Sequence, residues 1–370
     1  MQTVSVIGTG ILGAATAYHL AKAGVEVTMI DREEPGQATD AAAGIVCPWI
    51  SQRRNQAWYQ LAKAGARYYP TLIQALEEEG EPDTGYAKVG AISLHTEEKK
   101  QLEMVKRTLK RREDAPEIGE VIPLSEEETR ALFPLLAPGY RSVYVSGAAR
   151  VNGRSLRRAL LTAALRYGAK EVKGDATFAY EGADLVVRVN GESLLSDQVI
   201  VTAGAWAKAL LAPLGVEFMV SPQKAQIIHL ALPGADTGEW PVVMAPANHY
   251  MLAFGREHVV TGATHENEKG FDQRRTLAGM NEIFEKTLKT APGLAESTVL
   301  ETRVGFRPYT PEFLPVIGRL PSHEHVFVAN GLGASGLTVG PFLGAELARL
   351  VRGEKTELDL QPYDVAGAIE

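Results

Sequence analysis

The six residues GTGILG, at positions 8–13, directly follow the short apolar run VSVI at positions 4–7. The apolar run predicts a buried strand, and residues 14–23 after the glycines predict an amphipathic helix. A second predicted strand covers 25–30, and Asp31 closes it. A strand, a turn, a helix and a second strand in this order form a parallel βαβ unit, so we expect an α/β fold.

The three glycines of this turn have the spacing of a dinucleotide-binding site. Gly8 permits a tight turn, Gly10 lets a pyrophosphate approach the backbone, and Gly13 lets the helix pack closely on the strand. The start of the helix would offer free N–H groups and its positive dipole end to phosphates. Asp31 is placed to accept hydrogen bonds from ribose hydroxyls. A glycine turn without ligand is the alternative. The surrounding elements favour the dinucleotide, but they do not distinguish NAD from FAD.

Elements of the same kind recur along the chain. A buried strand at 199–201 leads into a small-residue turn, and a strand at 326–329 leads into the glycine-rich segment 330–336 and a helix over 338–352. The other expected elements are helices at 56–79, 96–113, 155–167 and 274–290, a small antiparallel sheet around 185–189, and strands at 226–232, 250–254 and 258–264. We therefore expect two interleaved domains.

The composition narrows the function class. The 370 residues suffice for two domains, and the net charge of −7 argues against nucleic acid as the main ligand. The single cysteine, Cys47, excludes an intramolecular disulfide. No apolar stretch is long enough for a transmembrane segment, and the amino-terminal apolar residues lack the basic start of a signal peptide, so we expect a cytoplasmic protein. The scattered histidines complete no metal site.

Five segments in order resemble the D-amino-acid oxidase superfamily of FAD-dependent enzymes. They are most similar to its glycine oxidase, sarcosine oxidase and D-amino-acid dehydrogenase group. The segments span almost the whole chain and are GTGILG with Asp31, ATDAAAGI at 38–45, VTAGAW at 201–206, GFRPYTPEFLPVIGR at 305–319 and NGLGASGLTVGP at 330–341.

The resemblance implies an FAD-binding Rossmann-like domain with a parallel central sheet, interleaved with a substrate domain on a mixed or antiparallel sheet. We assign 1–80, 145–212 and 300–365 to the FAD domain, and 81–144 and 213–299 to the substrate domain. The FAD should be non-covalent, because relatives with covalent flavin use a cysteine near the C-terminus. The residues expected at the cofactor are Gly8, Gly10, Ile11, Leu12, Gly13, Asp31, Arg32, Ala38, Thr39, Ala43, Gly44, Ile45, Ala176, Gly204, Leu332, Gly333, Ala334, Ser335, Gly336, Leu337 and Thr338.

Arg307 is the residue that the resemblance assigns to the substrate carboxylate. A planar guanidinium matches a carboxylate with two parallel hydrogen bonds, which supports this assignment. Arg303 is a nearby competitor. Tyr250 stands where relatives often place a tyrosine that also meets the carboxylate, although a strand tyrosine packed in the sheet is an equal alternative. His265 and Glu266 rank below Tyr250.

Several positions depart from the family pattern or have no assigned role. Many relatives have Arg-Gly-Gln where this chain has KAQ at 224–226, and an Asp-Pro where it has Asn-Gly at 152–153. Some glycine oxidases have a substrate-contacting arginine where this chain has Ala334. Trp49, Arg53 and Arg54 either shape the mouth of the pocket or have a structural role, and the structural role is favoured. These departures leave the substrate open.

The expected reaction transfers a hydride from the α-carbon or an N-methyl carbon of glycine, sarcosine or a D-amino acid to flavin N5. The resulting imine hydrolyses to an oxo acid or aldehyde plus an amine, and O2 or a quinone accepts the electrons. Three alternatives stay open: a D-amino-acid dehydrogenase that uses a quinone or partner, a flavoprotein subunit of a larger complex, and an NAD-dependent dehydrogenase, against which the segment 330–341 argues. A homo-oligomer is also open.

Overall fold

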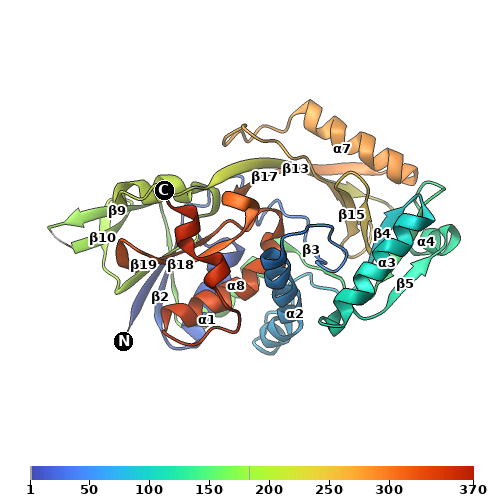
Figure 1. The fold of residues 1–370 in the computed structure, drawn as a ribbon. Coiled ribbons are helices and arrows are strands. Elements are labelled where there is room, and N and C mark those ends of the chain that lie inside the picture. Colours follow the sequence, from blue (N-terminus) through green and yellow to red (C-terminus); the bar gives the residue numbers. More distant parts are fainter. Residues whose placement is uncertain (1, 183) are drawn as a thin grey trace.

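The protein contains two large β-sheets. The computed structural model in Figure 1 shows helices on the outer faces of both sheets. The structure describes residues 2–182 and 184–370. Residues 1 and 183, which fall in the expected FAD-domain segments, lie outside the described residues. Among the described residues, no helix has both the length and the apolar character that a membrane crossing requires.

The first sheet has the strand order β18-β19-β12-β1-β2-β8. β1 pairs in parallel with β2 on one side and with β12 on the other, and only β18 is antiparallel to its neighbour. This sheet contains the βαβ unit expected from residues 4–31. Its strands are β1 (Thr3–Ile7), β2 (Glu26–Asp31), β8 (Lys170–Lys173), β12 (Gln198–Val201), β18 (Val316–Leu320) and β19 (His323–Asn330).

Helix α1 (Ile11–Lys22) packs between α8 (Gly336–Val351) and α5 (Gly153–Arg166), and α2 (Gln56–Glu78) packs against α8. Helix α1 begins three residues before the expected start at residue 14, because Gly10 is its N-cap and the last glycine of the turn already belongs to its first turn. The helices approach closely: a Cβ on Gly344 of α8 would lie 2.7 Å from the Cβ of Ala15 in α1.

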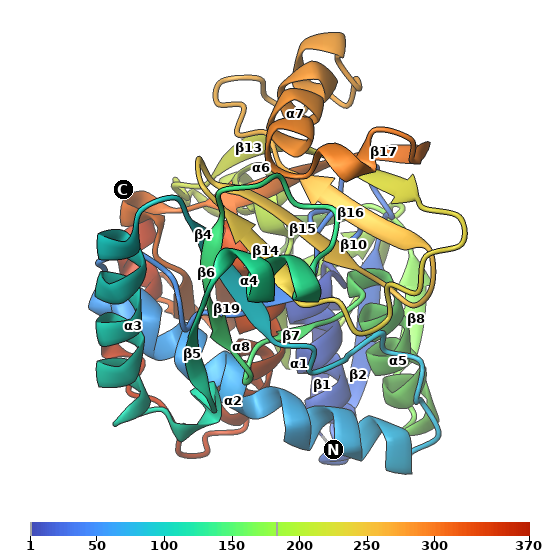
Figure 2. The same ribbon diagram turned by 90° about the vertical axis from the view of Figure 1, so that its right-hand side faces the viewer.

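The second sheet has the order β17-β13-β16-β15-β14-β4-β6-β5, and all its neighbours are antiparallel except β14 and β4. Figures 1 and 2 show the long strands β13 and β17 arching beneath α7 (Leu277–Thr290), while α3 (Glu98–Arg112) and α4 (Glu126–Leu132) cover the far end. The strands are β4 (Ala91–His95), β5 (Val121–Leu124), β6 (Arg141–Val145), β13 (Ser221–Ala231), β14 (Val242–Ala245), β15 (His249–Ala253), β16 (His258–Gly262) and β17 (Thr298–Tyr309).

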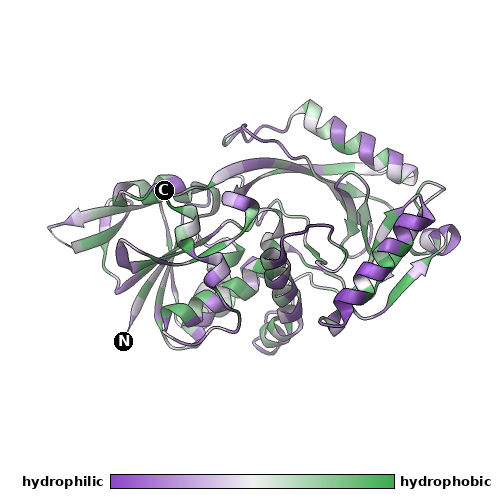
Figure 3. Ribbon diagram, viewed as in Figure 1, coloured by the Kyte–Doolittle hydropathy of each residue, from purple (hydrophilic) through white to green (hydrophobic). Residues whose placement is uncertain are grey.

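Smaller elements complete the fold. The antiparallel sheet expected around 185–189 is confirmed as β9 (Ala176–Glu181), β10 (Asp184–Val189) and β11 (Glu192–Leu194). β3 (Ile45–Val46) pairs with β7 (Ala149–Arg150), and α6 (Ala207–Leu211) follows β12. Figure 3 colours α3 mainly hydrophilic, in keeping with the many charged residues of this helix. The α/β fold class is therefore confirmed, whereas the exact domain boundaries stay a prediction.

A buried histidine pair gives the fold a predicted sensitivity to acid. His229 Nδ1 lies 2.9 Å from His258 Nε2, and burial, together with Arg303 and His258, lowers the pKa of His229 from 6.5 to about 3. Below pH 6.5 the unfolded chain takes up a proton that the folded chain does not, so stability falls as the pH falls from 6.5 toward 3. This group alone contributes at most about 1.4 kcal/mol per pH unit to that loss.

We expect His229→Asn to make the decline of the unfolding free energy between pH 6.5 and 4 shallower, by up to one proton. Urea unfolding at a series of pH values measures this slope. His325→Asn, at an exposed histidine, is the matched control and should keep the original slope. An unchanged slope in His229→Asn would show that this histidine is not the group that resists protonation.

Candidate cofactor and substrate site

A large cavity of about 1200 Å³ is lined by both sheets. Its wall includes the carboxyl ends of the parallel strands β1, β2 and β12, together with residues of β13, β15 and β17. In open α/β sheets, ligands bind outside the carboxyl ends of the strands. The cavity therefore combines the expected dinucleotide position with a face of the second sheet.

The glycine turn is shaped by backbone contacts that exclude side chains. Gly8 has φ +92°, its N–H donates to Ile30 O at 2.8 Å, and a Cβ there would lie 2.7 Å from Thr202 O. A Cβ on Gly13 would lie only 1.9 Å from Gly8 O. Gly13 is the one expected cofactor residue that does not line the cavity. It acts instead by letting α1 start directly above β1.

Asp31 organises the same turn from the end of β2. Its carboxylate accepts hydrogen bonds from Thr9 N at 2.7 Å and Thr9 Oγ1 at 3.0 Å, and from Gln37 Nε2 at 2.9 Å. Its neighbour Arg32 forms ion pairs with Glu34 and Asp175. Asp31 and Arg32 both line the cavity, so the ribose contact expected of Asp31 would add to bonds that already hold the carboxylate in place.

The cavity wall has room for a phosphate at two glycines. Gly10 caps α1 without a side chain, and a Cβ there would meet only Thr39 Oγ1, at 3.4 Å. Gly204 has φ +53°, and a Cβ there would meet no atom within 4 Å. The helix start thus offers N–H groups to open space, which fits a pyrophosphate. FAD would be held by the expected residues that line the cavity, which are all of them except Gly13.

Side-chain bonds join the segments on which the flavin ring should lie. Thr338 Oγ1 donates to Ile45 O at 2.9 Å, and Trp58 Nε1 donates to Ser335 Oγ at 3.0 Å. The N-cap of α8, Ser335, makes no side-chain capping bond, so the helix start remains open toward the cavity. The positive end of the α8 dipole would stabilise negative charge on a reduced flavin.

Arg307 of β17 and Tyr250 of β15 come together in the cavity wall, although β13 and β16 separate their strands in the sheet. Arg307 Nη1 donates to Gln223 Oε1 at 3.1 Å and to Thr264 O at 3.4 Å, and its guanidinium also bonds the Tyr250 hydroxyl. Burial raises the pKa of the Tyr250 phenol, while Arg307 opposes that rise. No carboxylate of the described residues lies within 4.0 Å of Arg307. Its charge is therefore free to meet an anion.

The structure separates the lower-ranked candidates. Arg303 is paired with Glu301 and bonds Asp40 O at 3.2 Å, so it does not line the cavity. His265 does line it, and burial together with Arg307 lowers the pKa of its imidazole. Glu266 does not line the cavity and accepts bonds from Gln226 and Thr264.

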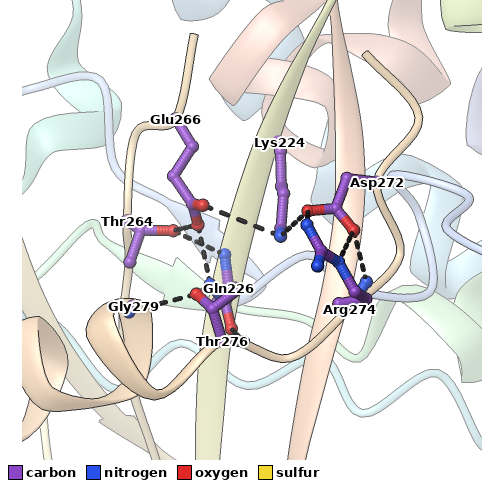
Figure 4. Close-up of polar contacts among 8 residues, drawn as sticks. All are labelled: Lys224, Gln226, Thr264, Glu266, Asp272, Arg274, Thr276 and Gly279. Carbon is purple, nitrogen blue, oxygen red and sulfur yellow. Dashed lines mark hydrogen bonds and ion pairs between the residues drawn. The ribbon is translucent and has the colours of Figure 1, made fainter. Parts of the chain in front are cut away.

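Figure 4 shows the ion cluster to which Glu266 belongs. Lys224 is fully buried, and its Nζ lies 3.1 Å from Asp272 and 3.7 Å from Glu266. This is the position where relatives have an arginine. The cluster fixes the chain that follows β16, which includes Thr264, the residue whose carbonyl accepts from Arg307. Lys224 therefore supports the substrate side of the cavity from behind.

The sequence did not single out several residues of the cavity wall, among them Cys47, Ser93, His95, Lys100 and Asn248. They lie on strands and loops that carry no family motif, and β4 itself was not expected. Arg53 also lines the cavity, whereas Trp49 is buried beside Gly147. Within residues 2–182 and 184–370, no three His, Cys, Asp or Glu side chains are grouped to hold a metal ion.

Removing the buried lysine should weaken both stability and the site. We expect Lys224→Met to lower the unfolding free energy by about 3 kcal/mol, because it leaves two carboxylates without their buried partner. Urea unfolding measures this loss. Lys286→Met is the control, since Lys286 makes only a partly exposed ion pair with Glu282 on α7. Equal effects of the two changes would contradict the role given to the cluster.

The packing of Gly13 can be tested through the bound flavin. We expect Gly13→Ala to lower the 450 nm flavin absorbance per protein about tenfold or more, because the methyl group would push α1 away from β1. Gly367→Ala is the control, since a Cβ at that site would meet no atom within 4 Å. A Gly13→Ala protein that stays fully yellow would refute the argument.

Comparison with known proteins agrees with this geometry. The chain is 60% identical to an uncharacterized oxidoreductase of Bacillus subtilis and 32% identical to a glycine oxidase of Pseudomonas aeruginosa, in each case over 100% of both chains. The fold is similar to the crystal structure of an iminodiacetate oxidase from a Chelativorans species, with a TM-score of 0.95, 45% identity and 98% of each chain covered. A glycine oxidase structure from Geobacillus kaustophilus gives a TM-score of 0.86, with 25% identity and 99% of each chain covered.

Residues 3–350 match the family described as FAD dependent oxidoreductase. The match spans the glycine turn, the cavity wall and Arg307, so the cofactor expected from the sequence is confirmed as FAD. That the FAD is held without a covalent bond stays a prediction. With these matches, the chain belongs to the family of FAD-dependent oxidoreductases that includes the glycine oxidases.

Proposed function

We propose that this enzyme oxidises the carbon–nitrogen bond of a small amino acid. The observation that carries the proposal is Arg307, a cation without a carboxylate partner among the described residues, which faces the cavity beside Tyr250. A guanidinium in this setting suits the carboxylate of an amino acid. Glycine, sarcosine and D-amino acids are the substrates suggested by the resemblance.

The chain's own residues would bind and orient the substrate. Arg307 would grip the carboxylate through two hydrogen bonds, and the Tyr250 hydroxyl would donate a third, which directs the α-carbon toward the flavin. His265 lines the same cavity, and burial together with the charge of Arg307 lowers the pKa of its imidazole, which makes it a weak base toward the substrate ammonium. FAD, when bound, supplies the two-electron chemistry by accepting a hydride.

The imine product would then hydrolyse to an oxo acid or aldehyde plus an amine. Either O2 or a quinone would accept the electrons from the flavin, which corresponds to an oxidase or a dehydrogenase. A second substrate class is an amine with two carboxymethyl groups. It is favoured by the 45% identity and the TM-score of 0.95 to the iminodiacetate oxidase.

The role of Arg307 is tested by anaerobic mixing with glycine, sarcosine, D-alanine and iminodiacetate while flavin bleaching is followed. We expect Arg307→Ala to lower the bleaching rate per substrate concentration about a hundredfold or more, because the carboxylate loses its charged partner. Arg307→Lys should lower the bleaching rate less, since lysine keeps the positive charge but lacks the two parallel N–H donors of the guanidinium. Arg256→Ala, at an exposed arginine, is the control. Normal bleaching in Arg307→Ala would sink the assignment.

A further inference from the structure

Arg53 is a second cation in the wall of the same cavity. It lies on the loop between β3 and α2, where its guanidinium donates to Phe313 O and stacks 4.8 Å from the centre of the Trp58 ring. Trp58 in turn bonds Ser335, in the turn that should pass beside the flavin. The side chain is thus held at the flavin end of the cavity, and its guanidinium donates to the described residues only through Nη2.

The strand that carries Arg307 also reaches Arg53. Tyr309 is two residues after Arg307 on β17, so both side chains leave the same face of the strand. The Tyr309 ring packs 4.7 Å from the ring of Phe313, whose carbonyl accepts from Arg53. Both arginines line the cavity, and they come from two separate segments of the chain that these contacts connect.

The other cations of the cavity wall already have partners. Arg32 is paired with Glu34 and Asp175, and Lys100 is paired with Glu97 at 2.5 Å with 63% of its side chain exposed. Arg53 has no carboxylate within 4.0 Å in the part of the chain that the structure describes. It is also partly desolvated, and burial lowers the pKa of its guanidinium. A desolvated cation without a partner is costly unless an anion joins it.

We propose that Arg53 binds a second carboxylate, so that the enzyme prefers secondary amines with two carboxylates, of the iminodiacetate type. The inference rests on the proposed function, in which Arg307 holds the first carboxylate. A C–H bond next to nitrogen breaks, and its hydride passes to the flavin. The imine takes up one water and gives glyoxylate and glycine. The final oxidant is O2, which would be reduced to H2O2, or a quinone, and FAD held by the cavity residues would carry the two electrons.

The test compares substrates of one shape and different charge. The holoenzyme is assayed with iminodiacetate and with its monoamide, in which a neutral amide replaces one carboxylate. We expect kcat/KM to favour iminodiacetate about a hundredfold, mainly through KM. Arg53→Gln should reduce that preference to a few-fold, while Arg54→Gln, at the exposed neighbouring arginine, should retain it. Arg53→Lys should keep an intermediate preference.

A binding measurement separates recognition from turnover. Thiodiacetate has sulfur in place of the amine, and (methylthio)acetate lacks its second carboxylate. Titration calorimetry should show thiodiacetate binding about a hundredfold tighter to the wild-type protein, and this difference should disappear in Arg53→Gln. If Arg53→Gln fails to fold or to hold FAD, the affinity difference between the two thioethers is compared between the wild-type protein and Arg53→Lys. An undiminished difference in Arg53→Lys would then contradict the role of Arg53.

The outcomes distinguish this inference from the proposed function. Equal use of iminodiacetate and its monoamide, or equal binding of the two thioethers, would overturn the role of Arg53 while leaving amino acid oxidation intact. A full preference in Arg53→Gln would do the same. If no amine in the panel bleaches the flavin while thiodiacetate still binds through Arg53, the proposed oxidation is wrong and the dicarboxylate site stands.

Discussion

The contact between Gly13 and the carbonyl of Gly8 is the constraint on which the rest of the structure depends. Because neither residue has a side chain, α1 can begin directly above the end of β1, and its first N–H groups face the cavity. Gly344 allows the same closeness between α1 and α8. The two helices that point toward the cofactor are therefore positioned by backbone approach, which a single methyl group would prevent.

Charge is distributed differently on the two faces of the second sheet. On the outer side, the buried Lys224 is satisfied by Asp272 and Glu266, which fixes the segment after β16. On the cavity side, Arg307 meets only neutral acceptors among the described residues, and so does Arg53 on the loop between β3 and α2. The protein thus satisfies its supporting charge internally and leaves Arg307 and Arg53 for a ligand. This contrast explains why the wall suits an anionic substrate.

The expected strands and helices were most reliable where the apolar pattern was regular. β1, β2, β12 and α8 are buried on both sides and have few charges, so the pattern was plain. β17 was missed because Glu301, Arg303 and Arg307 interrupt the alternation that predicts a strand. Glu301 and Arg303 neutralise each other two residues apart on the strand, whereas Arg307 is satisfied by Gln223 of β13, a tertiary contact that no local pattern shows.

The sequence by itself determined the dinucleotide-binding unit, because glycine spacing and strand pattern are local properties, and the five segments that resemble the family indicated FAD. It also pointed to Arg307. Only the tertiary structure distinguished Arg307 from Arg303, since one faces the cavity and the other is neutralised by Glu301. Only the tertiary structure brought Arg53 to the same cavity. The contacts of Arg303 with Asp40 and of Arg53 with Phe313 join residues more than two hundred positions apart, which meet only when the chain is folded.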